Sequence, residues 1–296
     1  MTGSPGPRRA GDGDAPPPPH LDIVQVDAFT SEPFAGNPAA VCVLDAFPPD
    51  DWLQAVAREM ALSETAFLRR RADAWALRWF TPTAEVDLCG HATLAAAHVL
   101  FQDGLDGGPD LRFETLSGGL GAKRDGDWIA LDFPAEPAAE SDAAPDLLRA
   151  LGLAPPDVVF AGRNRLDRLI SLRDAGLLRR LQPAMAALAE TDARGVIVTA
   201  PSDREDADFL SRYFAPAFGV PEDPVTGSAH CCLGPYWADR LGRERVVGFQ
   251  ASARGGTVRV RVAGDRVELA GQAVTVMRGR LTTAGGRNDD ALTADQ

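Results

Sequence analysis

Two glycine-centred loops contain the residue types that suit binding of a small anion. One loop spans Asp87–Ala92 and the other Asp223–Ala229, and each leads into a strongly apolar stretch. Gly90 and Gly227 let a ligand approach the backbone closely, and Ser228 can cap a helix or donate a hydrogen bond. The first N–H groups of a helix have no partner inside it and lie at its positive end. Each loop is therefore a candidate carboxylate site, although one such loop alone is more often an ordinary capped helix.

The two loops also follow one design. Phe-x-Pro precedes both, at Phe80–Pro82 and at Phe214–Pro216, and an aspartate, a small residue, a glycine, a polar residue and an alanine follow. Two loops of one design that lie far apart in the sequence indicate a duplicated domain. Two helix N-termini that face each other across a cleft would hold one small, negatively charged molecule.

Three titratable residues in or near these loops are candidates for proton transfer. Glu64 lies among apolar neighbours between an expected helix and an expected strand, where a carboxylate can both remove and return a proton. His91 opens the first apolar stretch, and imidazole titrates near neutrality. Asp223 is the acid of the second loop. Each residue also has an ordinary alternative: a solvated turn cap for Glu64, a backbone-bonded helix start for His91, and a turn before proline for Asp223.

The thiols predict neither a disulfide frame nor a metal site. Cys42, Cys89, Cys231 and Cys232 form no Cys-x-x-Cys pair, and the four histidines lack metal-ligand spacing. This pattern is typical of free thiols in the cytoplasm. Cys89 precedes an expected helix start, a position that can lower the pKa of a thiol and make it a base.

Composition limits the partners and the domain plan. With 296 residues the chain is long enough for two domains of common size. A net charge of −12 argues against a nucleic-acid or anionic-membrane partner, and no apolar run approaches the length of a membrane span. Residues 1–20 are rich in Gly, Pro and Asp and lack the apolar core of a signal peptide, so we expect a disordered tail there. We expect a second loose tail at residues 282–296 and a cytoplasmic location.

The elements that must position these residues are many short strands and few helices. The two stretches after the loops are apolar nearly all round, so both helices should be buried. Short strands with hairpin turns predict an α+β fold with mostly antiparallel pairing around a central helix. Residues 134–144 have the composition of a linker. Helices are expected at Pro49–Met60, Thr93–Phe101, Pro183–Glu190 and Ala229–Leu241, with strands at most of the apolar runs between them.

Five ordered motifs resemble the PhzF family, the phenazine-biosynthesis isomerases of the diaminopimelate-epimerase-like superfamily. Besides the two loops, they are Phe29-Thr30 with Gly36–Val41, Leu62–Phe67, and Arg254–Gly256. The similarity covers roughly residues 21–281. It implies two similar domains, residues 21–133 and 134–281, each a curled sheet or barrel around one helix, with the last strand able to pack back on the first domain. The active site would lie in the cleft between them.

The resemblance also implies roles for individual residues. It makes Glu64 the general acid/base, with Ser63 lining the site. His91 and Asp223 would contact the substrate and assist proton transfer. The substrate carboxylate would be bound by Gly90, Gly227 and Ser228. No cofactor and no metal are expected, and we expect a homodimer.

Three functions remain open at this point. The first is a cofactor-independent isomerase that moves a proton within a small carboxylate-bearing metabolite through an enol- or dienol-like species. The second is a racemase or epimerase that uses Cys89. Superfamily members with two catalytic thiols place one on each loop, and this chain has Thr226 near the second position. The third is a non-catalytic small-molecule-binding protein. The combination of Glu64, His91 and Asp223 favours the first, and the sequence does not identify the substrate.

Overall fold

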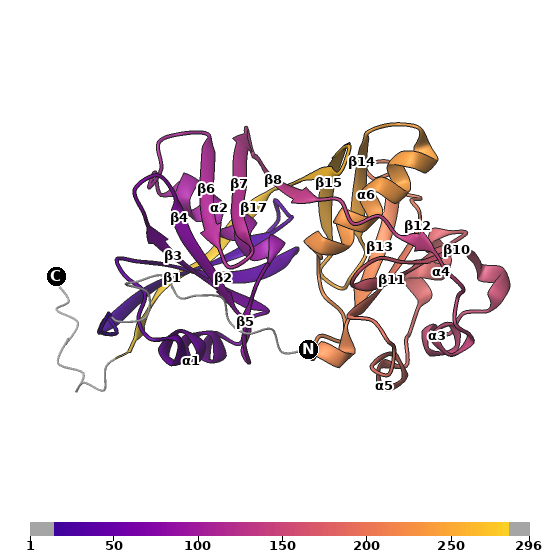
Figure 1. The fold of residues 1–296 in the computed structure, drawn as a ribbon, viewed down its shortest axis with the longest axis horizontal. Coiled ribbons are helices and arrows are strands. Elements are labelled where there is room, and N and C mark those ends of the chain that lie inside the picture. Colours follow the sequence, from indigo (N-terminus) through magenta and orange to yellow (C-terminus); the bar gives the residue numbers. More distant parts are fainter. Residues whose placement is uncertain (1–14, 284–296) are drawn as a thin grey trace, which may run out of the picture.

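The computed structural model describes residues 15–283, in which many strands surround a few helices (Figure 1). Most of the predicted tails, residues 1–20 and 282–296, lies outside this range. The first strand begins at His20, and its neighbour Pro19 accepts a hydrogen bond from the Thr283 N–H at 3.0 Å. The two ends of the described chain therefore lie side by side. Within residues 15–283, no helix is both long and apolar enough to cross a membrane.

The first half of the chain forms two helices and a series of strands, bounded as follows: β1 (His20–Ala28), β2 (Asn37–Leu44), α1 (Asp50–Met60), β3 (Glu64–Arg70), β4 (Trp75–Phe80), β5 (Glu85–Val86), α2 (Gly90–Gln102), β6 (Asp110–Thr115), β7 (Gly118–Asp125) and β8 (Trp128–Pro134).

The second half forms β9 (Ala139–Glu140), α3 (Pro145–Leu151), η1 (Pro155–Asp157), β10 (Val158–Arg163), β11 (Asp167–Leu172), α4 (Ala175–Arg180), α5 (Met185–Leu188), β12 (Gly195–Pro201), β13 (Phe209–Phe214), η2 (Pro216–Phe218), α6 (Gly227–Leu241), β14 (Arg245–Gln250), β15 (Gly256–Ala263), β16 (Arg266–Gly271) and β17 (Ala273–Thr282). The stretch expected as a linker at residues 134–144 contains β9, which pairs with β10.

The same order of strand pairings occurs twice along the chain. The series β1–β2–β3–β4–β6–β7–β8 pairs antiparallel, parallel, antiparallel, parallel, antiparallel and antiparallel. The series β10–β11–β12–β13–β14–β15–β16 follows the same sequence of directions. Parallel neighbours need a crossover connection, and α2 and α6 are the crossovers of β4–β6 and β13–β14. Both glycine loops are therefore the entries to equivalent crossover helices.

Two further pairings join the halves of the chain. β17 pairs antiparallel with β1, and β16 pairs antiparallel with β8. The predicted α+β class is confirmed, and most of these pairings are antiparallel as expected. Four pairs differ from that expectation and are parallel: β2–β3, β4–β6, β11–β12 and β13–β14. In each of them the connection contains helix rather than a tight turn.

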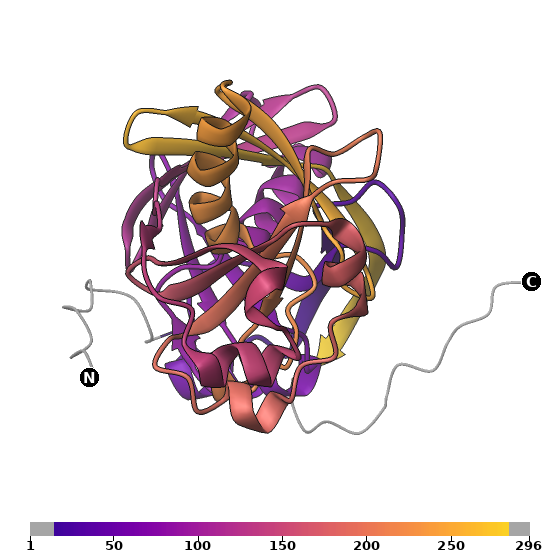
Figure 2. The same ribbon diagram turned by 90° about the vertical axis from the view of Figure 1, so that its right-hand side faces the viewer.

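The crossover helices α2 and α6 lie among the strands, whereas α1, α3 and α5 lie on the outside (Figures 1 and 2). Residues of α2 such as Leu94 and Ala95 are fully buried, as are Cys232 and Leu233 of α6. These side chains belong to one continuous apolar core that extends through both halves. Both helices are thus buried as their composition predicted, while Gly90 and Ser228 in their first turns are only partly buried.

Candidate active site

The N-termini of α2 and α6 meet. A Cβ built on Gly90 would lie 3.5 Å from the Cα of Gly227, so the two backbones are separated by little more than one methyl group. The N-cap residues are Cys89 and Thr226, both extended, and neither side chain caps its helix. The positive ends of two helices therefore point to one place, with backbone donors that no side-chain cap satisfies. Such a place suits an anion.

Glu64 and His91 form a close pair at this meeting point. Glu64 opens β3 and His91 is the second residue of α2, and their Oε2 and Nε2 atoms lie 3.0 Å apart. The atoms do not align as a hydrogen bond, so the contact is a charge pair. Burial disfavours a charged imidazole, but the neighbouring Cys89 and Glu64 more than offset burial and raise the pKa of His91 well above its ordinary value. The nearby carboxylate of Glu64 thus favours the protonated form of His91.

Cys89 does not have the activated thiol that its place before a helix suggested. Its Sγ lies 3.5 Å from Nδ1 of His91. Burial and the charge of Glu64 together raise the pKa of Cys89, and His91 offsets only part of this effect. The expected lowering of the thiol pKa is therefore wrong, because desolvation outweighs the helix dipole at a fully enclosed sulfur.

Asp223 lies across from this pair and is held by neutral donors. Its Oδ1 accepts from Asn37 Nδ2 at 2.8 Å, and its Oδ2 accepts from the Thr226 hydroxyl at 2.5 Å. Burial raises the pKa of Asp223, although His91 and these hydrogen bonds oppose the effect. Gln250 supports the loop, because its Oε1 accepts from the Thr226 N–H at 2.9 Å and its Nε2 donates to the Asp223 carbonyl at 2.7 Å.

Ser228 has a partner that the sequence did not reveal. Arg194 Nη2 donates to Ser228 Oγ at 2.8 Å and to Asp167 Oδ2 at 2.7 Å, while its Nε donates to Asp167 Oδ1 at 3.0 Å. The hydroxyl of Tyr213 also donates to Asp167, at 3.0 Å. Arg194 precedes β12 in a region without any motif, and only the fold brings it to the start of α6. A guanidinium is thus fixed next to the Ser228 hydroxyl by its ion pair with Asp167.

The remaining site residues also lie here. Ser63 donates a long hydrogen bond of 3.4 Å to Asn37 Oδ1 and so borders the Glu64 side of the site. The ligand atoms of Glu64, Cys89 and His91 lie within 4.8 Å of one another, and this set of oxygen, sulfur and nitrogen could hold a cation such as zinc. A metal at this place would have to displace the proton of the Cys89 thiol and separate His91 from Glu64. We therefore assign no metal to the site.

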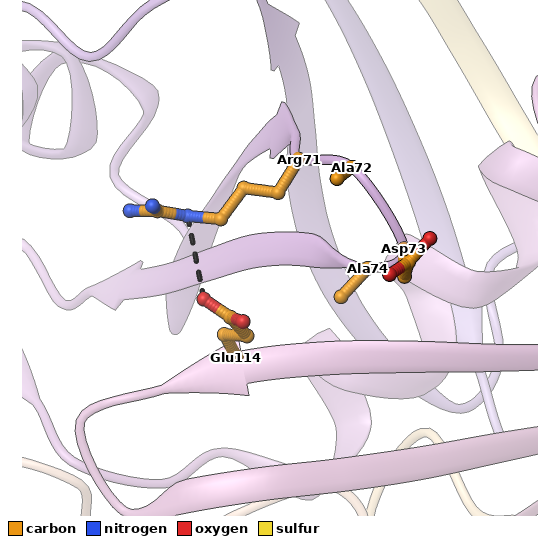
Figure 3. Close-up of a pocket in the computed structure, with 5 residues that line it drawn as sticks. All are labelled: Arg71, Ala72, Asp73, Ala74 and Glu114. Atoms are coloured by element: carbon orange, nitrogen blue, oxygen red, sulfur yellow. Dashed lines mark ion pairs between the residues drawn. The ribbon is translucent and has the colours of Figure 1, made fainter.

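A separate surface hollow lies at the other end of β3. Its lining residues are Arg71, Ala72, Asp73, Ala74 and Glu114 (Figure 3). Arg71 Nε and Glu114 Oε2 form an ion pair at 3.4 Å across it. Because a strand rises about 3.3 Å per residue, roughly 20 Å separate this hollow from Glu64. It has no helix N-terminus or nucleophile, so the meeting point of α2 and α6 remains the candidate site.

Comparison with known proteins identifies the family. Residues 26–279 match the family described as phenazine biosynthesis-like protein, PhzC-PhzF. An uncharacterized isomerase of Halalkalibacterium halodurans is 51% identical over 261 residues, which cover 88% of this chain and 97% of the relative. A crystal structure of a PhzF-family phenazine biosynthesis protein from Enterococcus faecalis has a TM-score of 0.84 at 40% identity, over 88% of this chain and 99% of that chain. This chain belongs to the phenazine biosynthesis-like PhzF family.

The wider likeness concerns the fold alone. A crystal structure of a hydroxyproline epimerase from Agrobacterium vitis has a TM-score of 0.58 at 13% identity, over 90% of this chain and 93% of that chain. The PhzF assignment made from the motifs is confirmed, and so, at the level of the family, is the prediction of an enzyme of the isomerase class.

Proposed function

We propose that the protein is a cofactor-independent isomerase in which Glu64 moves a proton between two carbons of a small carboxylate-bearing substrate. The observation that carries the proposal is the 3.0 Å pair of Glu64 and His91 beside two helix N-termini that lack side-chain caps. This pair brings two side chains that can carry a proton into contact where the substrate would bind, and a carboxylate such as Glu64 can both remove and return a proton. Because Oε2 is buried against His91, Oε1 is the oxygen that can meet the substrate.

Substrate recognition is assigned to the start of α6. The backbone N–H groups of Gly227 and Ser228 and the Ser228 hydroxyl bind the substrate carboxylate in this proposal. Arg194 occupies an acceptor position of Ser228 Oγ, so the hydroxyl hydrogen is free to be donated to an anion. Gly90 allows the same substrate to approach the start of α2, and Ser63 lines the Glu64 side.

The chemical step needs no oxidant, reductant or co-reactant. Ionised Glu64 takes a proton from one carbon, and the electron pair of that C–H bond enters the unsaturated system of the substrate to give an enol- or dienol-like species. Protonated Glu64 then returns the proton to a second carbon, so substrate and product contain the same atoms. The two helix N-termini, His91 and the ligands of the carboxylate stabilise the negative charge that develops in between.

The wider setting belongs to the same proposal. We propose that the substrate lies in a cleft between two similar domains, residues 21–133 and 134–281. The duplicated order of strand pairings supports this division. We also expect a homodimer in the cytoplasm. Size-exclusion chromatography with light scattering would give the molar mass in solution. The mass of a monomer would contradict the expected dimer.

The racemase alternative has less support. Cys89 and Thr226 are the equivalent N-cap residues of the two crossover helices, so the second loop has a hydroxyl where a second thiol is needed. The raised pKa of Cys89 also disfavours a thiolate base near neutral pH. A non-catalytic binding protein is the remaining alternative, and the same experiment separates all three.

The test uses unsaturated and amino carboxylic acids incubated with the protein in deuterated water. We expect wild type to give a new compound that carries deuterium, Glu64→Gln to give little, and the exposed control Glu205→Gln to match wild type. Deuterium exchange at the wild-type rate in Glu64→Gln would contradict the proposal. Inversion at an α-carbon that depends on Cys89 would instead support the racemase, and bound ligands without exchange would support a binding protein.

A further inference from the structure

Two sequence motifs have no part in the proposed chemistry, and the structure brings them together. Asn37 begins β2 and is fully buried, while Arg254 lies in the loop between β14 and β15. The Gly36 N–H donates to the Gly255 carbonyl at 2.7 Å, and the Thr257 N–H donates to the Phe29 carbonyl at 2.9 Å. The segment before Asn37 is thus attached to the second half of the chain by its backbone.

Arg254 adds a side-chain clasp to this attachment. Its Nε donates to the Gly36 carbonyl and its Nη2 to the Ala35 carbonyl, each at 2.8 Å. Its Nη2 also donates at 2.8 Å to Asp27, which is 1% exposed. Gly36 has a φ of 63°, and a Cβ there would lie 2.2 Å from the Ala28 carbonyl oxygen, so the turn requires glycine. The clasp therefore fixes where the side chain of Asn37 can point.

Two hydrogen-bond acceptors fix the orientation of the Asn37 carboxamide, because both need the NH₂ side of the amide. Its Nδ2 donates to Asp223 Oδ1 at 2.8 Å and to the Val225 carbonyl at 2.9 Å, which uses both amide hydrogens. The same nitrogen lies 3.3 Å from His91 Nδ1. Rotating the amide by half a turn would put its oxygen against a carboxylate and a carbonyl. The observed orientation is therefore the one that the surroundings allow.

This orientation has a consequence for both loops. The Asn37 amide nitrogen lies against Nδ1 of the His91 ring, whose Nε2 faces Glu64, so this amide adjoins the proton-transfer pair directly. Asp223 accepts a hydrogen bond at each oxygen, from Asn37 and from Thr226, which is the pattern of an ionised carboxylate. One neutral side chain thus connects the proton-transfer side to the acid of the second loop.

We propose that Asn37 is a positioning residue that holds Asp223 as an ionised, oriented carboxylate facing His91, with Arg254 fixing Asn37 from behind. The inference adds to the proposed function and rests on it only in placing His91 and Asp223 at the substrate. Packing alone does not require Asn37 to orient Asp223 or to favour its ionised form. A buried polar residue elsewhere in the core would support stability without changing the ionisation of Asp223.

The test follows the titration of the Asp223 side chain by carbon NMR on the full chain with labelled aspartate carboxyl groups, assigned by Asp223→Asn. The charged and titratable groups that face Asp223 are His91, Glu64 and Tyr213. In wild type we expect a pKa above the ordinary 3.8. Asn37→Leu keeps the shape but removes the donor to the charged form, so the pKa of Asp223 should rise further, with a roughly tenfold change in the protonation equilibrium.

The matched control is Thr199→Val. Thr199 is also fully buried, and its hydroxyl donates to the Leu210 carbonyl and accepts from Trp237. This variant should lose stability yet leave the Asp223 titration at its wild-type position. If Asn37→Leu does not fold, Asn37→Ser is measured in the same way, because its shorter side chain leaves Asp223 out of reach.

An Asp223 titration that is unchanged in the folded Asn37 variant would overturn the inference, as would an equal shift in Thr199→Val. Neither result bears on Glu64, because the titration is measured without substrate. An active Glu64→Gln variant would conversely overturn the proposed function and leave the contact between Asn37 and Asp223 unaffected.

Discussion

The starts of α2 and α6 share a backbone design and differ in chemistry. Each helix follows a buried phenylalanine at a strand end and crosses over to a parallel strand. Each begins at a glycine, and the N-cap residue before it is extended and makes no side-chain hydrogen bond to the helix. At α2 the adjoining groups are a carboxylate and an imidazole at 3.0 Å, which can exchange a proton. At α6 they are the Ser228 hydroxyl and a guanidinium, which can bind an anion.

In the proposed function, this difference lets one duplicated unit supply two functions. The backbone gives both loops the same positive helix end, and the side chains next to each loop would determine whether that end supports proton transfer or recognition. Asp223 belongs to the second loop but faces the first through Asn37. The two loops are thus specialised without being independent.

The supports of the two loops differ as well. Asp167 and Arg194 pair within the second half of the chain, with Asp167 1% exposed and the Arg194 side chain 31% exposed. Asp27 and Arg254 pair between β1 and the loop before β15, so their contact crosses from one half to the other. The loop before α6 is therefore supported by an ion pair within its own half of the chain. The loop that leads to Asn37 is supported by an ion pair between the two halves of the chain.

Removal of the imidazole should have a large effect, and it should affect rate rather than binding. His91→Gln retains polarity but cannot carry charge beside Glu64, so turnover should fall by a factor on the order of 10² to 10⁴. The control is His98→Gln on the same helix, where the ring contacts Thr275 at 3.1 Å and lies away from Glu64. Steady-state kinetics of both variants provide the measurement. Wild-type turnover in His91→Gln would place proton transfer outside the first loop.

The anchor of the second loop should account for a large part of its stability. Asp167→Asn leaves Arg194 partly buried without its charged partner. We expect a loss of about 3 kcal/mol in the free energy of unfolding, the low end for a broken buried pair because part of the arginine is exposed. Asp192→Asn breaks ion pairs at a side chain that is 65% exposed, and should cost less than about 1 kcal/mol. Urea unfolding distinguishes the two, and equal losses would remove the contrast.

Ser228→Ala should weaken binding with a smaller effect on the chemical step. Loss of one hydrogen bond to a charged ligand typically costs about 1–3 kcal/mol, roughly a tenfold to hundredfold rise in Kd. Calorimetry with the identified substrate gives the affinity. Ser202→Ala is the control, since that hydroxyl accepts from the Arg204 N–H in a distant turn. An unchanged Kd in Ser228→Ala would show that the carboxylate binds elsewhere.

Cys89→Ser should have the smallest effect. The buried thiol lies against His91 but has a raised pKa, so serine preserves its size and polarity near neutral pH. Turnover should stay within several-fold of wild type in a variant whose thermal unfolding is normal. A loss of several orders of magnitude would favour the racemase mechanism over the present account.

The sequence predicted the features that depend on local pattern. The two glycine loops and the buried helices after them follow from motifs and apolar runs. The family resemblance singled out Glu64, and the structure brings its side chain into contact with His91. The α+β class follows from the short strands. The loops, the helices and the fold class were accessible because each depends on residues that are neighbours in the sequence.

The missed features depend on distant contacts or on weak local signals. Arg194 and Asn37 acquire their roles only when the fold brings them to Ser228 and Asp223. β7 was not expected, because it contains glycines and is mostly exposed, so it shows no alternation of apolar residues. α3 was missed as a short helix that begins at proline next to an apparent linker. The parallel strand pairs likewise follow from crossovers that no local pattern specifies.

The most direct test of the division between the loops is the comparison of Glu64→Gln turnover with Glu64→Gln binding, using the identified substrate. The glutamine keeps the size of the side chain and its capacity for hydrogen bonds but cannot exchange a proton. We expect turnover to fall by a factor on the order of 10² to 10⁴. The calorimetric Kd should stay close to wild type, because the carboxylate is bound at α6. Near wild-type turnover in Glu64→Gln would contradict the account at its centre.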